Sequence, residues 1–457
     1  MNAILLTLAL LALSTVAYQS GRRRALCTVG GVGHLLHSRP GYHGAYVLLW
    51  CLIPTAAVVT IWISFEGIIV DSLVTAAFPG GENLSLADRS LFLTEIRNVA
   101  ADNTGITDPE KLALGAYFSD LRLIGTGGMI ALALAAGSGG IYWARRLIAA
   151  KLRARQRVER MVLMIFVICS TLAILTTLGI VLSLLFEALR FFAKVSVVEF
   201  LFGLHWSPQT ALRDDQVGAS GAFGAVPVIT GTLLITFISM LVAVPIGLMS
   251  AVYMAEYATQ GVRAWVKPAL EVLAGVPTVV YGFFAALTVG PFIRELGTNL
   301  GLDVASESAL AAGLVMGIMI VPFVSSLSDD VINAVPQGLR DGAYALGATK
   351  SETIRQVVLP AALPGIIGSV LLAVSRAIGE TMIVVMAAGL AANLTANPLQ
   401  AVTTVTVQIV TLLVGDQEFD SAKTLAAFAL GLVLFLLTLL LNVIALIVVR
   451  RYREKYD

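Results

Sequence analysis

Two neighbouring stretches organise this chain. Residues 341–360 read DGAYALGATKSETIRQVVLP, a polar and helix-prone segment between hydrophobic runs. Residues 368–389 read GSVLLAVSRAIGETMIVVMAAG, which is long enough to cross a bilayer. This second run carries Arg376 and Glu380 near its middle, where a charge is costly unless it is paired or solvated. A polar hairpin beside a charged span suggests a protein that moves an anion through a membrane.

The composition indicates a membrane protein. Of the 457 residues, 58% are hydrophobic and 13% are charged, whereas soluble domains are about one-quarter charged. The net charge of +1 gives no case for nucleic-acid binding. Cys27, Cys51 and Cys169 have no metal-site spacing and make no disulfide framework. We expect an all-α polytopic membrane protein that contacts membrane lipids and needs no metal and no cofactor.

About nine apolar runs have the length of a membrane-spanning helix, roughly 20 residues. They cover residues 2–18, 46–66, 123–143, 161–186, 227–253, 272–292, 308–327, 363–390 and 424–449. Gly and Ala in the third run predict close helix packing. Gly and Pro at 275–282 predict a kinked or broken sixth span. The apolar run 399–414 is too short to cross, and whether it re-enters the membrane stays open.

The basic segments lie on one side of this topology. They are residues 22–24, 145–160, 340–355 and 450–455. Because positive segments stay in the cytoplasm, we expect the N-terminus outside and the C-terminus in the cytoplasm. The run 145–160 also suggests contact with RNA or anionic lipid, but its place between two spans makes it a topology signal first. Residues 66–121 then form an external loop, with short helices expected at 87–98 and 109–120.

The segment from 337 to 362 has the features of a docking hairpin. Residues 337–346 suit a short helix, and Gly347 suits a turn with positive φ. Ser351 is expected to cap a second helix, which Pro360 and Pro364 are expected to end. An ordinary cytoplasmic loop is the alternative interpretation of these residues.

The spacing of this hairpin resembles the EAA loop of binding-protein-dependent ABC transporter permeases, E-A-A-x3-G-x9-I-x-L-P. Ala343, Gly347, Leu359 and Pro360 match, and Asp341 and Gly342 replace the Glu and the first Ala. In addition, Val357 replaces the Ile. In that family the loop seats in a cleft of the ATPase subunit. The resemblance therefore implies that these residues couple the chain to an ATPase.

Three further motifs narrow the resemblance. They are FGAVPVITGTL at 223–233, GVPTVVYG at 275–282 and SRAIGETMIVVMAAG at 375–389. These are similar to the permeases of the high-affinity phosphate importer, most closely the PstC-type subunit, with the PstA-type as its paralogue. The resemblance covers about residue 161 to the end and implies a six-span permease core at 161–457. Residues 1–160 form an N-terminal extension whose role the resemblance does not imply.

Arg376 and Glu380 are four residues apart, hence on one helix face. A structural ion pair is one interpretation, and a contact with the transported anion is the other, because Arg suits bidentate phosphate binding. The resemblance favours the pathway, with Ser375 and Thr381 adding hydroxyl contacts. Glu380 would hold Arg376 in place or accept a hydrogen bond from a protonated phosphate.

The sequence thus predicts a pore subunit of an ATP-driven phosphate importer in a bacterial inner membrane. It contains no phosphate-binding loop of the G-x4-G-K-[ST] form, so the chain is not expected to be an enzyme and the ATPase is expected on a separate, dimeric subunit. A second permease and a periplasmic phosphate-binding protein complete the expected partners. The alternatives are a permease for another oxyanion, such as sulfate or molybdate, and a membrane scaffold or regulator without transport.

Overall fold

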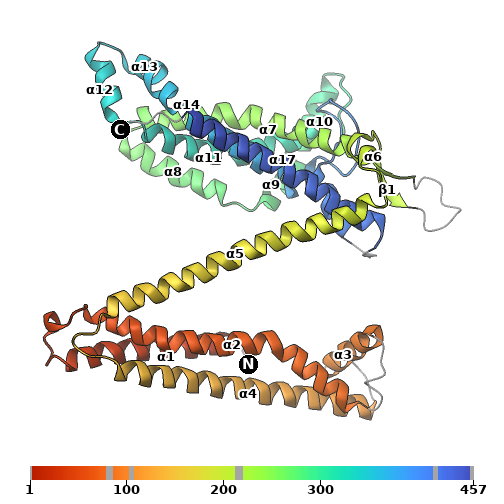
Figure 1. The fold of residues 1–457 in the computed structure, drawn as a ribbon. Coiled ribbons are helices and arrows are strands. Elements are labelled where there is room, and N and C mark those ends of the chain that lie inside the picture. The colour runs from red at the N-terminus through yellow and green to blue at the C-terminus, as the bar shows by residue number, and fades with distance from the viewer. Residues whose placement is uncertain (1–2, 79–85, 102–107, 211–219, 415–419, 453–457) are drawn as a thin grey trace. The chain divides into compact units, whose positions relative to one another are not determined.

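The computed structural model describes residues 3–78, 86–101, 108–210, 220–414 and 420–452. The chain forms two compact units, Met1–Leu175 and Thr176–Asp457, and helix α5 (Ala154–Phe192) runs through the boundary between them (Figure 1). The predicted end of the N-terminal extension at residue 160 also lies in α5 and stays a prediction.

Eight helical stretches among the described residues are long and apolar enough to cross a membrane, which confirms the all-α polytopic class. They are Pro40–Ala77, Pro109–Arg146, Ala154–Phe192, Val226–Tyr257, Thr278–Asn299, Ala309–Asn333, Lys350–Ile378 and Ala422–Arg451. The first predicted span, residues 2–18, falls on helix α1 (Ala3–Cys27), which is not among the eight, and residue 2 lies outside the described residues.

Unit 1 consists of long helices. They are α1, α2 (Pro40–Ala77), α3 (Leu86–Ala100), α4 (Pro109–Arg146) and the first part of α5, with a 3₁₀ turn at Gly33–Leu35. Helices α1, α2 and α4 lie side by side (Figure 1). The expected external loop is largely helical, because α2 continues to Ala77. Helix α3 confirms the short helix predicted at 87–98. The short helix predicted at 109–120 was wrong in its end, because α4 starts at Pro109 and continues without a break to Arg146.

The contact between α2 and α4 depends on small residues, as the Gly- and Ala-rich third span predicts. A Cβ atom on Gly140 would lie 1.9 Å from the carbonyl oxygen of Trp50, so only glycine fits. One turn away, the hydroxyl of Thr55 donates to the carbonyl of Cys51 at 2.7 Å and lies 3.4 Å from the carbonyl oxygen of Ala133. The two backbones therefore approach closely enough for polar contacts across the interface.

Unit 2 holds the remaining elements. The helices are α6 (Val197–Phe202), α7 (Val226–Val252), α8 (Gln260–Ala274), α9 (Thr278–Phe284), α10 (Gly290–Asn299), α11 (Ala309–Asn333), α12 (Gln337–Ala345), α13 (Lys350–Thr353), α14 (Leu359–Ile378), α15 (Met382–Ala387), α16 (Val405–Leu413) and α17 (Ala422–Tyr452). Strands β1 (Trp206–Thr210) and β2 (Ser220–Phe223) pair antiparallel, with Trp206 opposite Phe223. Helices α7 and α11 pack along each other at the centre, around Ile235, Met316 and Ile320.

In the described residues of unit 2, three π-helical turns interrupt the helices. They cover Tyr253–Tyr257 after α7, Ala285–Val289 between α9 and α10, and Ile354–Val358 between α13 and α14. Such turns are rare and occur frequently at functional sites. In a regular helix the ring of Pro360 would clash with the carbonyl of Gln356. The third turn contains Gln356, and the helix continues through the proline.

The sixth predicted span is broken, as its Gly and Pro residues indicated. Helix α8 ends at Ala274, and α9 begins at Thr278, directly after Pro277. The membrane-length helix is therefore Thr278–Asn299 instead of residues 272–292.

The eighth span also differs from its prediction, residues 363–390. The helix begins at Lys350 and ends at Ile378, and α15 starts anew at Met382. Gly379 caps the first helix, and the carboxylate of Glu380 accepts a hydrogen bond from the Met382 N–H at 3.0 Å. The prediction that Arg376 and Glu380 share one helix face was therefore wrong. The prediction that Pro360 and Pro364 end the helix was also wrong, because both lie within α14.

Replacing Gly140 by alanine should separate α2 from α4. We expect Gly140→Ala to lower the free energy of unfolding by roughly 1–3 kcal/mol, the usual cost of overpacking. Gly139→Ala is the matched control, because among the described residues no atom outside its own helix turn lies within 4 Å of its added Cβ. Thermal unfolding of the purified chain, followed by fluorescence-detected size exclusion, measures the difference. Equal midpoints for the two variants would contradict the proposed packing constraint.

Candidate functional site

A cavity of about 230 Å³ lies among the helices of unit 2. Most of its lining comes from α8 and α11, and Arg376 contributes from α14. Its polar lining residues are Lys267, Glu271, Ser326, Asp329 and Arg376. The cavity therefore combines two cations, two carboxylates and one hydroxyl within a membrane-spanning unit.

Arg376 is the cation that the sequence singled out. It lies in the last turn of α14, where the free backbone carbonyls favour a positive charge. Its guanidinium carbon is 5.5 Å from the centre of the Phe323 ring, a cation–π contact with α11. No carboxylate forms an ion pair with Arg376 among the described residues. The donors of the guanidinium are thus available to a ligand.

The other predicted pathway residues lie apart from the cavity lining. The carboxylate of Glu380 accepts from the Met382 N–H at the start of α15, and its backbone carbonyl accepts a hydrogen bond from the Thr406 hydroxyl at 2.8 Å. Ser375 and Thr381 are half-buried beside Arg376 and Glu380 in the chain, and neither lines the cavity. The structure therefore brings one of the four predicted residues into the cavity.

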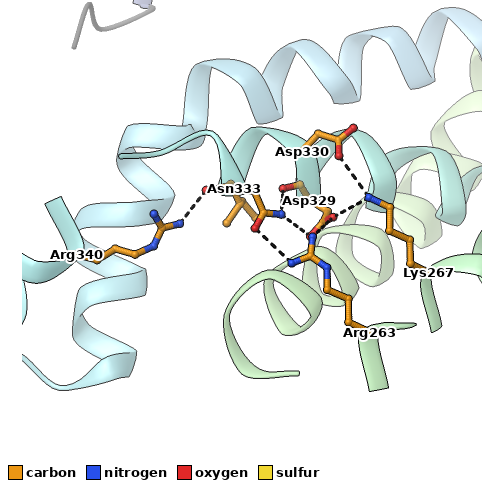
Figure 2. Close-up of polar contacts among 7 residues, drawn as sticks. Arg263, Lys267, Asp329, Asp330, Asn333 and Arg340 are labelled. Carbon is orange, nitrogen blue, oxygen red and sulfur yellow. Dashed lines mark hydrogen bonds and ion pairs between the residues drawn. The ribbon is translucent and has the colours of Figure 1, made fainter. Parts of the chain in front are cut away.

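A buried carboxylate, Asp329, organises the wall of the cavity (Figure 2). Arg263 Nη2 donates to both of its oxygens, at 3.2 and 2.9 Å, and Lys267 Nζ lies 3.3 Å away. The side-chain amide of Asn333 donates to it at 2.9 Å. A charge removed from water needs such partners, since an unpaired one costs several kcal/mol. This cluster ties α8 to the end of α11.

Arg340 anchors the predicted coupling hairpin to the same end of α11 (Figure 2). Its Nε and Nη2 atoms donate to Glu256 Oε1 at 3.1 and 2.9 Å. Its Nη1 and Nη2 atoms also donate to the carbonyls of Val335 and Ile332, at 2.5 and 2.9 Å. Both side chains of this ion pair are at least 90% buried. The hairpin is thus bound to α11 and to the π-helical turn after α7.

The hairpin itself confirms most of its predicted form. Helix α12 ends at Ala345, and Gly347 follows with a φ of +88°. The predicted cap at Ser351 was wrong, because α13 already begins at Lys350 and Ser351 lies inside it. Thr349 caps α13, and its side chain and that of Glu352 form a reciprocal capping box.

The hairpin presents an exposed surface. Of the predicted coupling residues, Asp341, Gly342, Gly347 and Pro360 are exposed, and Ala343 and Leu359 are half-buried. Leu346, which directly follows α12 at the turn of the hairpin, is 91% exposed. Helices α12 and α13 project at one end of unit 2 (Figure 1). An apolar side chain at such a tip is a candidate contact for another protein.

Sequence reasoning missed Asp329, Lys267, Arg263 and the Arg340–Glu256 pair. The sequence offered one signal for a buried charge, because Asp329 and Asp330 directly follow an apolar run. Their cationic partners lie more than 60 residues away in the chain, so no local spacing could identify them.

Comparison with known families agrees with this architecture. Residues 243–454 match the binding-protein-dependent transport system inner membrane component, and residues 7–176 match a family described as a phosphate ATP-binding cassette transporter. The chain is 33% identical over 279 residues to the probable ABC transporter permease protein YqgH of Bacillus subtilis, covering 61% of this chain and 86% of that protein.

Two further likenesses were found. The chain is 34% identical over 283 residues to the phosphate transport system permease protein PstC 1 of Mycobacterium tuberculosis, covering 56% of this chain and 83% of that protein. A bacterial alginate ABC transporter structure aligns with a TM-score of 0.46 and 16% identity, covering 66% of this chain and 99% of that chain.

The membrane-length helices and the family matches together define an integral membrane component of a binding-protein-dependent transport system, a multi-pass protein of the inner membrane. Within that class, the chain belongs to the PstC-type family of ABC transporter permeases.

Removing the buried Arg340 should loosen the hairpin. We expect Arg340→Ala to lower the free energy of unfolding by about 3–5 kcal/mol, because it leaves Glu256 buried without its partner. Arg355→Ala is the control, since Arg355 is exposed on the same hairpin. Thermal unfolding measures the stability, and hydrogen exchange at residues 337–353 measures the loosening. Similar exchange in both variants would refute the anchoring role.

Proposed function

We propose that this chain is one of two pore subunits of an ATP-driven importer of inorganic phosphate. Phosphate would arrive from a periplasmic binding protein and pass through the permease to the cytoplasm. The relatives named as phosphate transport permeases support this substrate. The observation that carries the proposal is Arg376, a cation in the lining of a cavity in the membrane-spanning unit that has no carboxylate partner among the described residues.

The chemistry of the cavity suits a hydrogen-bonding oxyanion. A guanidinium can hold two phosphate oxygens at once, which gives a strong and oriented contact. Ser326 can donate a further hydrogen bond, whereas the carboxylate of Glu271 can accept one from a protonated phosphate oxygen. Fully ionised oxyanions such as sulfate lack that proton. In this proposal, Ser375, Glu380 and Thr381 belong to the pathway beyond the cavity, on the side of α15.

The proposed motor is a separate, dimeric ATPase subunit that docks on the hairpin. A movement of α12 would be transmitted to the cavity lining through a short chain of contacts. Arg340 is bonded to the carbonyl of Ile332 in α11, and Asp329, one turn earlier in that helix, lines the cavity. A paralogous permease would complete the pore around the exposed side of Arg376.

The proposed topology places the N-terminus outside and the C-terminus in the cytoplasm. In unit 2, α17 packs on α14 and ends near the hairpin, which supports a C-terminus on the ATPase side (Figure 1). In unit 1, the connection between α1 and α2 meets the connection between α4 and α5, where the His37 N–H donates to the Ala150 carbonyl at 3.0 Å. Both connections are flanked by arginines, which supports a cytoplasmic position for them.

Loss of the Arg376 guanidinium should abolish phosphate transport. We expect Arg376→Ala to reduce ATP-dependent phosphate uptake to background, because no other cation of the cavity lining is free of ion pairs. Uptake is measured in proteoliposomes that contain the ATPase, both permeases and the binding protein. Arg376→Lys keeps the charge without the bidentate fork and should retain a part of the uptake.

Two controls make this result interpretable. The variant complex must retain all of its subunits in size exclusion, and competition with sulfate and molybdate identifies the anion. Wild-type uptake by a fully assembled Arg376→Ala complex would exclude the pathway role of Arg376. Equal competition by sulfate would point to another oxyanion as the substrate.

A charge at the tip of the hairpin should prevent docking of the ATPase. We expect Leu346→Asp to abolish co-purification of the ATPase, because an exposed leucine that becomes buried in a contact cannot be replaced by a carboxylate. Leu302→Asp is the control, since Leu302 is exposed but lies outside the hairpin. If the ATPase co-purifies with both variants in equal amounts, the tip is not its docking site.

A further inference from the structure

A second cavity, of about 380 Å³, lies in unit 1 between the end of α4 and the start of α5. Its charged lining residues are Lys151, Arg153, Arg157 and Arg160, and Gln156 lies among them. Within the part of the chain that the structure describes, the lining contains four cations and no carboxylate. The nearby acid Glu159 forms an ion pair with Arg155 at 2.6 Å, outside the lining. Four like charges around one concavity repel one another, so the site favours an anion.

The geometry of the site is partly fixed by its neighbours. Arg157 Nη1 lies 3.3 Å from the Tyr46 hydroxyl, and its guanidinium carbon lies 5.9 Å from the centre of the same ring. The connection between α1 and α2 is bonded to the start of α5, because the Arg155 N–H donates to Ser38 Oγ at 3.3 Å. The start of α5 contributes the positive end of a long helix. Backbone and side chains thus present positive potential to the same space.

The position of this cavity along the helices places it at the level of the lipid headgroups. Tyr142 and Trp143 in α4 are 68% and 49% exposed, and α4 ends three residues later at Arg146. Exposed Tyr and Trp are typical of the membrane–water interface. The cavity begins directly beyond this level, at Ala149. Basic pockets between membrane helices are known to hold anionic headgroups.

We propose that this cavity binds the phosphate group of an anionic phospholipid. The site lies in the N-terminal extension and is independent of the proposed phosphate pathway, so either proposal can fail without the other. In this proposal the basic run at 145–160 both sets the membrane topology and binds lipid, and different residues of the run serve these two roles. Arg153 and Arg160 line the cavity, whereas Arg145 and Arg146 belong to α4 and do not.

This difference supplies a matched test. The full-length chain is purified in detergent, and binding of fluorescent phosphatidylglycerol is titrated for three proteins. These are the wild type, Arg153→Gln/Arg160→Gln and Arg145→Gln/Arg146→Gln, so that each variant loses two arginines. We expect the cavity variant to raise the half-saturating lipid concentration about 25-fold, since each basic residue near an anionic surface contributes about fivefold. The α4 variant should change it less than about threefold.

The controls separate the alternatives. Phosphatidylcholine should not compete, because it carries no net charge, and inorganic pyrophosphate should not displace the lipid. Thermal unfolding checks that each variant is folded, and Lys151→Gln replaces the double variant if it is not. Equal shifts for the two double variants, or lipid binding unchanged in the cavity variant, would overturn the proposal. Displacement by pyrophosphate, without preference for phosphatidylglycerol over phosphatidylcholine, would also overturn it and indicate a soluble anion.

Discussion

The buried carboxylate of Asp329 is the constraint on which the working part of this molecule depends. A charge in the interior is tolerated only with partners, and Asp329 obtains them from Arg263 and Lys267 of α8 and from Asn333 of its own helix. Satisfying this one group fixes α8 against α11. It also forms a wall of the cavity that Arg376 closes from α14.

Helix α11 therefore has two roles along its length. Its apolar part packs with α7 at the centre of unit 2, which gives a stiff element. Its polar end carries Asp329 toward the cavity and offers the Ile332 carbonyl to Arg340 of the hairpin. The hairpin and the cavity are thus joined by about one turn of one helix. Arg340 therefore links the hairpin directly to α11, in addition to the backbone connection at residues 334–336.

The sequence predicted the features that depend on local chemistry. Long apolar runs marked the membrane helices, and Gly347 marked the left-handed turn because other residues adopt positive φ at a cost. The Gly379 break was missed, since apolar residues on both sides suggested one continuous span. The Arg340–Glu256 pair was beyond reach because the two residues are 84 positions apart. The ion pairs of Asp329 with Arg263 and Lys267 could not be predicted for the same reason. Of the predicted pathway residues, Arg376 alone lines the cavity.

The π-helical turn at Ile354–Val358 has a consequence for the orientation of Arg376. A π turn holds one residue more than the α turn that it replaces, and one residue corresponds to about 100° of rotation around the helix axis. Every side chain beyond the turn is rotated by that angle relative to an uninterrupted helix. Arg376 lies about 24 Å further along, at 1.5 Å per residue from Pro360. The extra residue beside the hairpin therefore sets the direction in which the Arg376 side chain leaves the helix axis toward the cavity.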